Sequence, residues 1–268
     1  PPASPAASSW VVLSWNDLGM HCYNRDFQNL AVLPPFNTLW SQVIHVGDPP
    51  QIVTDTVSVT YSFPNNTYSV GKSNFWDYDL ALFGVDLPPN IGLTGRGLAG
   101  NMDRAADHFI ADGIPLTEFQ DSAPTTAYPY QLATVIAGAA DGTELARTIT
   151  VAPVSTEMHC DYCHQDGGVE DIATGSVETN ILTLHDRENA EDYPPGFGKL
   201  MDNRPVLCAA CHASNALGAP GKPDIPNLSK AMHSKHAEVE NGGGDDGGGD
   251  DGGGLGAAQG TAGRRPQA

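Results

Sequence analysis

Short apolar stretches and alternating stretches dominate residues 10–155. Residues 10–15 form an apolar run, and residues 56–61 alternate strictly between polar and apolar side chains, as a strand with one buried face does. Pro and Gly recur between these stretches, where they favour turns. We therefore predict a mainly β domain over residues 10–155, preceded by an N-terminal extension over residues 1–9.

One pair of strands is predicted most clearly. The stretches 130–136 and 145–151 flank Asp141-Gly142, a dipeptide that favours the tight turn of a β-hairpin. Several short strands with frequent turn residues are typical of an immunoglobulin-like sandwich or a related small barrel, which is the fold that we expect. No long helix is predicted in this domain. A short one is expected near residues 102–109, within a Gly-rich loop.

The pattern changes over residues 156–240, where little of the chain has the period of a helix or of a strand. One short helix is expected around His185, with Thr179 or Asn180 as its cap. A second is expected over residues 226–240. The fold class predicted for the whole chain is thus a β domain followed by a mostly irregular domain with a few short helices.

The composition narrows the list of partners. The formal net charge is −19, which argues against a nucleic acid partner because a phosphate backbone attracts Lys and Arg. No apolar run reaches the length of about 18 residues that spans a membrane. Residues 241–268 are rich in Gly and Asp and have little to bury, so we predict a disordered tail there. The chain opens with Pro1-Pro2-Ala3-Ser4-Pro5, which resembles a mature N-terminus after signal-peptide cleavage, so we expect a periplasmic or extracellular protein.

The strongest chemical signal is a repeated C-x-x-C-H pentamer. It occurs as Cys160-Asp161-Tyr162-Cys163-His164, the first pentamer, and as Cys208-Ala209-Ala210-Cys211-His212, the second pentamer. Two thiols three positions apart can form thioethers with the two vinyl groups of one porphyrin, and the next imidazole then becomes an axial ligand of the iron. The sequence therefore predicts two haem c groups, one on each pentamer.

The alternative interpretation is a zinc site or a pair of redox-active dithiols. Two C-x-x-C pairs that share one zinc ion are usually separated by about 15–20 residues, and these two pairs lie much farther apart. A zinc site also leaves the His after each second Cys without a role. Haem is the interpretation that we favour.

Through the two pentamers and their His-rich surroundings, residues 156–240 resemble the multihaem c-type cytochromes. The resemblance implies a haem-packed domain, electron transfer to and from redox protein partners, maturation outside the cytoplasm and, commonly, two His ligands for each iron. Some extracellular members of this group polymerise into filaments. Many members carry four or more pentamers, whereas this chain has two.

Two irons with proximal ligands His164 and His212 need two further axial ligands. His185 lies beside apolar residues on the expected helix, which suits the edge of a buried haem. His233 and His236 share one face of the second expected helix, and we expect at least one of them to be a ligand, with a slight preference for His236.

Other side chains compete for these positions. His21, next to the unpaired Cys22, is a distal ligand, part of another metal site or a packed core residue. His159 directly precedes the first pentamer, and adjacency alone does not aim it at either haem, so it is a candidate ligand of the other iron or of an iron in a neighbouring subunit. Met201 and Met232 are weaker candidates, because Met more often fills gaps in a core. We interpret His45 and His108 as structural.

Three functions fit these expectations. The first is electron transfer through two six-coordinate haems. The second is a subunit of a filament in which haems continue from one copy to the next. The third is a dihaem enzyme with one open iron, which we rank last because the candidate ligands suffice to close both sites.

Overall fold

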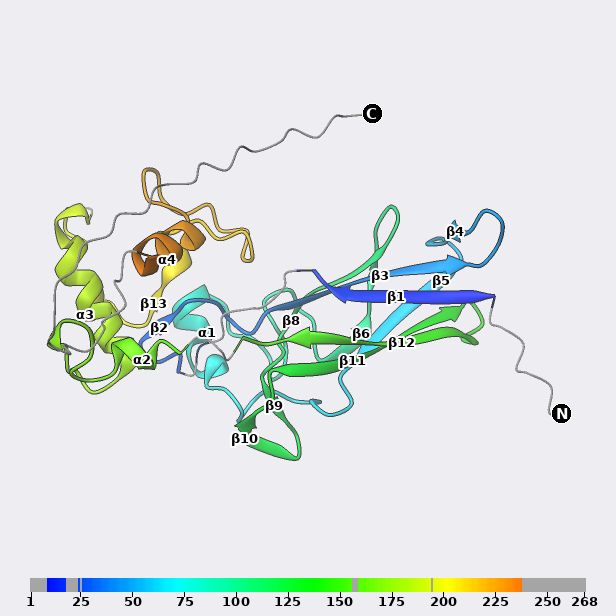
Figure 1. Cartoon of the computed structure of the whole chain (residues 1–268), viewed down its shortest axis with the longest axis horizontal. Helices are drawn as coiled ribbons and strands as arrows, with labels where there is room; N and C mark the ends of the chain where they lie inside the picture. The colour runs from blue at the N-terminus through cyan, green and yellow to red at the C-terminus, as the bar shows by residue number, and fades with distance from the viewer. Residues whose placement is uncertain (1–8, 18–23, 25, 156–158, 194, 238–268) are drawn as a thin grey trace, which may run out of the picture.

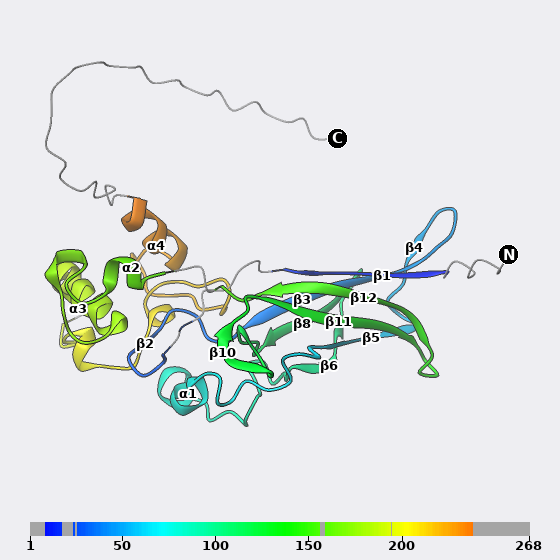
Figure 2. The same ribbon diagram turned by 60° about the horizontal axis from the view of Figure 1, so that its bottom comes forward.

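The computed structural model describes residues 9–17, 24, 26–155, 159–193 and 195–237. The predicted tail, all but Ser9 of the predicted extension, and the candidates His21 and Cys22 lie outside these ranges. Strands gather in one half of the molecule and most helices in the other (Figures 1 and 2). None of the helices within the described ranges has the length and apolar character that crossing a membrane requires.

Two antiparallel sheets make up the strand-rich half (Figure 1). The first sheet has the order β1-β3-β8-β7 with β4 paired to β3, and the second has the order β12-β11-β5-β6. The strands of the first sheet are β1 (Trp10–Asn16), β3 (Asn37–His45), β4 (Gln51–Ile52), β7 (Asp103–Arg104) and β8 (Phe109–Ile114). Those of the second are β5 (Val57–Ser62), β6 (Ala99–Asn101), β11 (Tyr130–Ala139) and β12 (Glu144–Pro153). A small separate pair joins β9 (Phe119–Gln120) to β10 (Ala123–Ala127).

The two sheets share one apolar core. Leu39 and Val43 on β3 are fully buried, and so are Val135 and Ala137 on β11. Side chains two positions apart in a strand point to the same face, so each sheet turns one face inward and the two inner faces pack together. The predicted β-rich character of this half is confirmed.

The predicted hairpin is also confirmed. Strands β11 and β12 pair antiparallel on either side of Asp141-Gly142. The Asp141 carboxylate accepts a hydrogen bond from the Thr143 amide at 2.9 Å, and Gly142 has a φ of 87°. Glycine adopts this left-handed conformation without strain, whereas a residue with a side chain would not, and so Gly142 suits the turn.

This half holds a short helix that the sequence pattern does not predict. Helix α1 (Phe75–Phe83) follows Asn74 and ends at Gly84, which has a φ of 72°. Phe75 is fully buried against Phe27, with ring centroids 5.3 Å apart. Phe27 and Phe75 are far apart in the sequence, so the local pattern alone does not reveal the helix.

The short helix expected near residues 102–109 is not present. Strands β7 and β8 occupy this segment, and the Met102 amide donates to the Val59 carbonyl at 2.8 Å. Met102 is buried in the core between the sheets. The segment is thus held by strand pairing and by burial of Met102, which a helix over the same residues would disrupt.

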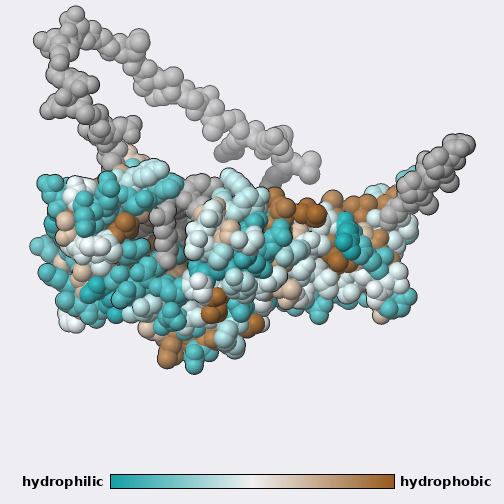
Figure 3. Space-filling view, turned by 90° about the horizontal axis from the view of Figure 1, so that it is seen from below, coloured by the Kyte–Doolittle hydropathy of each residue, from teal (hydrophilic) through white to brown (hydrophobic). Residues whose placement is uncertain are grey.

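The outer face of the sheets carries apolar side chains. Val11, Leu13 and Trp15 on β1 are exposed, and Ile149 and Val151 on the neighbouring strand β12 are exposed as well. Apolar residues are visible on the surface of the strand-rich half in Figure 3. Exposed apolar groups that lie close together are typical of interaction surfaces.

The other half is built from short helices and turns. Its α-helices are α2 (Asp161–His164), α3 (Val177–Asn189) and α4 (Leu228–Ala237). Its 3-10 turns are η1 (Val169–Asp171), η2 (Ala190–Asp192), η3 (Leu200–Asp202) and η4 (Cys208–Ala210). Helix α3 begins earlier than expected, because the Ser176 hydroxyl, and not Thr179 or Asn180, accepts from an amide of the first turn.

A short parallel strand pair connects the two halves. β13 (Val206–Leu207) pairs with β2 (Leu30–Ala31), and Leu30 packs with Leu182 and Leu200 in a small apolar cluster. β13 leads directly into the second pentamer. The β-rich half therefore holds the start of that pentamer in place.

Candidate functional site

The two pentamers share one backbone hydrogen bond. The His164 amide donates to the Cys160 carbonyl at 2.8 Å, and the His212 amide donates to the Cys208 carbonyl at 3.0 Å. Each pentamer thus forms one helical turn. Residues three and four apart in a helix lie on the same face, so each turn presents two thiols and an imidazole to the same side.

A glycine after each pentamer lets the chain fold back onto it. A Cβ on Gly168 would lie 2.2 Å from the Cys163 carbonyl oxygen. A Cβ on Gly221 would lie 2.3 Å from the Ala213 amide nitrogen. Both distances are far too short for a real contact, so only Gly permits these two loops to brace the helical turns.

The histidine of each pentamer faces one other histidine. The rings of His164 and His236 have centroids 6.4 Å apart and planes 79° apart. The rings of His212 and His185 have centroids 6.2 Å apart and planes 77° apart. Two imidazoles that bind opposite sides of one metal ion at about 2.0–2.1 Å have centroids about 6.3 Å apart. Both pairs match this separation.

Helix α3 contacts both pairs. The buried side chain of Asn180 donates to the His164 carbonyl at 2.8 Å and to Asp166 at 2.9 Å. His185, farther along the same helix, faces His212. One rigid element thus fixes the backbone of the first pentamer and supplies the partner of the second.

Helix α4 also contacts both pentamers: its start bonds next to the second, and its end carries the histidine that faces the first. Its first residue, Leu228, donates through its amide to the Ala213 carbonyl at 2.9 Å, next to His212. Its last turn carries His236, which faces His164. α4 contains no fully buried residue, and only Leu228, Ala231 and Met232 are partly buried.

Hydrogen bonds fix the tautomer of two of these imidazoles. Nδ1 of His212 lies 2.8 Å from the Pro226 carbonyl oxygen, and Nδ1 of His236 bonds to the Met232 carbonyl oxygen. A carbonyl oxygen only accepts, so each Nδ1 carries the proton. Nε2 then keeps its lone pair, which is the arrangement found in histidines that bind metals.

His185 has a different partner. Its Nδ1 lies 2.7 Å from the Tyr193 hydroxyl, and this hydroxyl donates to the Asp186 carboxylate at 3.0 Å. The carboxylate also accepts from the amides of Leu200 and Met201. Burial and the adjacent Asp186 carboxylate raise the pKa of Tyr193, so the phenol keeps its proton.

The environment of His164 and of His185 favours their neutral form. Burial lowers the pKa of His164 and of His185, and the facing imidazole in each pair lowers it further. A neutral imidazole is the form that binds a metal. The residues of both pairs therefore fit an iron ion with two axial histidines.

The two C-x-x-C pairs do not share one zinc site. Burial raises the pKa of the Cys208 thiol to about 12, so this thiol keeps its proton at neutral pH. Among the described residues, which include all four pentamer cysteines, no group of three or more Cys, His, Asp or Glu could hold a metal ion, so the two C-x-x-C pairs do not converge on one zinc site.

The remaining candidates lie apart from the two facing pairs. His159 stacks on Tyr162 with centroids 4.4 Å apart. His233 lies exposed on α4. His45 packs against Trp10, and His108 stacks on Trp40, in keeping with structural roles.

Sequence reasoning missed three residues of this arrangement: Asn180 as a contact of the first pentamer, and Tyr193 and Asp186 as partners of His185. Asp186 follows His185 directly, but the spacing of the residues does not reveal that its side chain turns back to Tyr193. Tyr193 lies in a Pro-rich stretch without periodicity, where no local pattern marks it.

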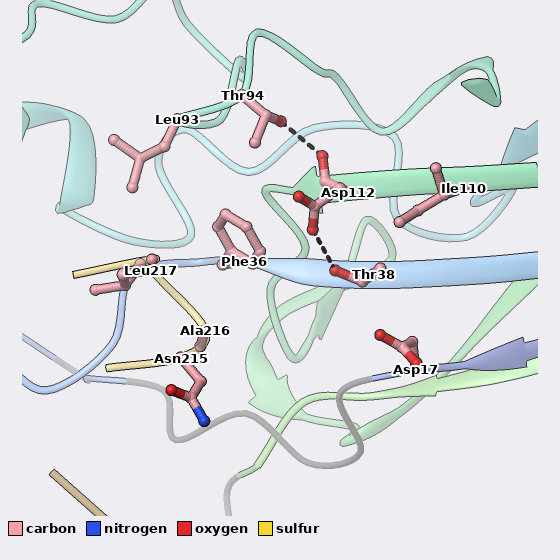
Figure 4. A pocket seen from close by; sticks show the side chains of 11 residues that line it. Asp17, Phe36, Thr38, Leu93, Thr94, Ile110, Asp112, Asn215, Ala216 and Leu217 are labelled. Atoms are coloured by element: carbon pink, nitrogen blue, oxygen red, sulfur yellow. Dashed lines mark hydrogen bonds between the residues drawn. The ribbon is translucent and has the colours of Figure 1, made fainter. Parts of the chain in front are cut away.

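A cavity of about 520 Å³ lies elsewhere, between the β-rich half and the chain that follows the second pentamer (Figure 4). Phe36, Asp112 and Leu217 are among its lining residues, and Asp112 accepts a hydrogen bond from Thr38 at 2.7 Å. The lining includes no pentamer cysteine and none of the facing histidines. The cavity is thus separate from the candidate site.

Comparisons with protein-family models, with curated proteins and with solved structures gave no significant match to this chain. The interpretation of the site therefore depends on the residues and geometry described above.

Proposed function

We propose that this protein binds two haem c groups and transfers electrons through them. The observation that carries the proposal is the pairing of histidines. Each pentamer histidine faces one other imidazole at the separation expected for two axial ligands of one iron. A C-x-x-C-H sequence alone does not require such a partner.

At the first pentamer, Cys160 and Cys163 would form the thioethers, with His164 and His236 as axial ligands. At the second, the thioethers would come from Cys208 and Cys211, with His212 and His185 as axial ligands. The hydrogen bonds at Nδ1 of His236, His212 and His185 orient these rings and leave Nε2 for the iron.

When bound, each haem supplies reversible one-electron chemistry between Fe(III) and Fe(II). The protein's part would be to hold each haem between two imidazoles, His164 with His236 and His212 with His185, which would leave the iron no place for a substrate. This favours an electron carrier over a dihaem enzyme with an open iron.

The haems would also account for the packing of the helical half. α4 buries none of its residues, yet it lies with His236 opposite His164. A porphyrin between the two rings would give this helix an apolar surface to cover. In this proposal the β-rich half is an immunoglobulin-like sandwich that serves docking, and the protein matures and acts outside the cytoplasm.

A second candidate function is a subunit of a cytochrome filament. One observation favours it: the exposed apolar side chains of β1 and β12, among them Leu13 and Ile149, form a surface that a second copy could cover. Electron microscopy of the purified protein distinguishes isolated particles from polymers.

Low-temperature EPR of the mature, oxidised protein tests the proposed function. We expect two low-spin ferric haems, because both irons have two strong imidazole ligands. Because the two ring planes in each pair are nearly perpendicular, we expect low-spin EPR signals with strongly anisotropic g values. A high-spin ferric signal that changes when cyanide is added would instead support the enzyme with an open iron.

A further inference from the structure

The two facing pairs differ in what lies behind the distal imidazole. Nδ1 of His236 bonds to the Met232 carbonyl oxygen in its own helix, which is a neutral acceptor. Behind His185 lies Tyr193, and behind Tyr193 lies the Asp186 carboxylate. Among the described residues, only the second site thus connects its distal imidazole to a formal negative charge through hydrogen bonds.

The direction of these hydrogen bonds follows from the number of protons available. The Tyr193 hydroxyl has one proton, which it donates to Oδ1 of Asp186. The Tyr193 oxygen therefore accepts the proton of His185 Nδ1, 2.7 Å away. The Leu200 amide donates to the same Asp186 oxygen at 2.8 Å, and the Met201 amide donates to the other oxygen at 3.1 Å.

The three side chains are rigidly placed. Asp186 is buried, with 6% of its surface exposed. The Tyr193 ring packs edge-on against Phe197, with centroids 5.6 Å apart, and lies beside the His185 ring at 5.9 Å. Because these contacts hold the phenol, its hydroxyl stays within hydrogen-bond distance of both neighbours.

We propose that Tyr193 is a positioning residue that links His185 to Asp186 and thereby lowers the reduction potential of the haem on the second pentamer. The inference rests on the proposed function. A hydrogen bond from Nδ1 towards an anion makes the imidazole a stronger donor to the iron. A stronger donor stabilises Fe(III) relative to Fe(II), and so the haem becomes harder to reduce.

The test is Tyr193→Phe in the mature, haem-loaded protein, with the two midpoint potentials measured by spectroscopic redox titration. The variant keeps the ring and its contacts with Phe197 and removes only the hydroxyl. We expect one midpoint to rise, on the order of a tenfold change in the one-electron reduction equilibrium, or about 59 mV. The other midpoint should stay in place, and the EPR signal of one haem should change.

Tyr128→Phe is the matched control. It removes the same hydroxyl from a tyrosine that is 44% exposed and lies in the β-rich half, outside both pentamers. We expect both midpoints to remain as in the wild type. Suppose that Y193F carries two haems by mass spectrometry but has the same two midpoints and the same EPR signals as the wild type. This result would overturn the role of Tyr193 and leave the proposed function standing. A wild-type protein without haem would instead overturn both.

Discussion

Replacing Cys208 and Cys211 together by alanine should yield a protein that carries one haem instead of two. The thioethers to these two sulfurs are the only covalent link that the proposal gives to the second haem. We expect the mass of the mature protein to fall by about 0.6 kDa and the Soret absorbance to fall by about half. Intact-protein mass spectrometry measures the first quantity, and absorption at equal protein concentration measures the second.

The matched variant is the double replacement of Cys160 and Cys163 by alanine. It should remove the other haem and leave the pair His212 and His185 in place. The two variants should therefore lose the same mass but retain different low-spin EPR signals. An unchanged haem content in either variant would show that the corresponding pentamer does not attach a haem.

Replacing His236 or His185 by alanine should convert one of the two haems to the high-spin state. Each variant removes the imidazole that faces a pentamer histidine, and an iron with one axial imidazole is five-coordinate or binds a weak ligand. Low-temperature EPR and the visible spectrum report the change. Added imidazole should restore the low-spin state, because the free ligand enters the space left by the side chain.

His233→Ala provides the control within the same helix. His233 lies exposed on α4, three residues before His236. Its replacement should leave both haems low-spin, because His236 is the residue of α4 that faces His164. The opposite result, a high-spin haem in H233A and none in H236A, would exchange the roles of these two histidines. If neither replacement had an effect, α4 would not supply a ligand.

Local patterns in the sequence predict local features of the structure. The alternating stretches and Asp141-Gly142 predict the hairpin of β11 and β12, because the turn and both strands depend on neighbouring residues. The C-x-x-C-H spacing marks both pentamers in the sequence for the same reason, and the structure folds each of them into one helical turn. His185 and His236 each lie opposite a pentamer histidine in the structure, and that they bind iron stays a prediction.

Features that depend on distant contacts were missed. Helix α1 forms where Phe75 meets Phe27, and β7 pairs with β8 between residues 103 and 110, beside the buried Met102. The pairing of His164 with His236 and of His212 with His185 likewise depends on the positions of α3 and α4, because each helix contacts both pentamers. The spacing of residues along the chain does not encode these positions.

The most direct test of the central claim is the intact mass of the mature protein purified after export. The account predicts a mass about 1.2 kDa above that of the polypeptide, equal to two covalently attached haems, in a red protein. A colourless protein with the mass of the bare polypeptide would contradict it.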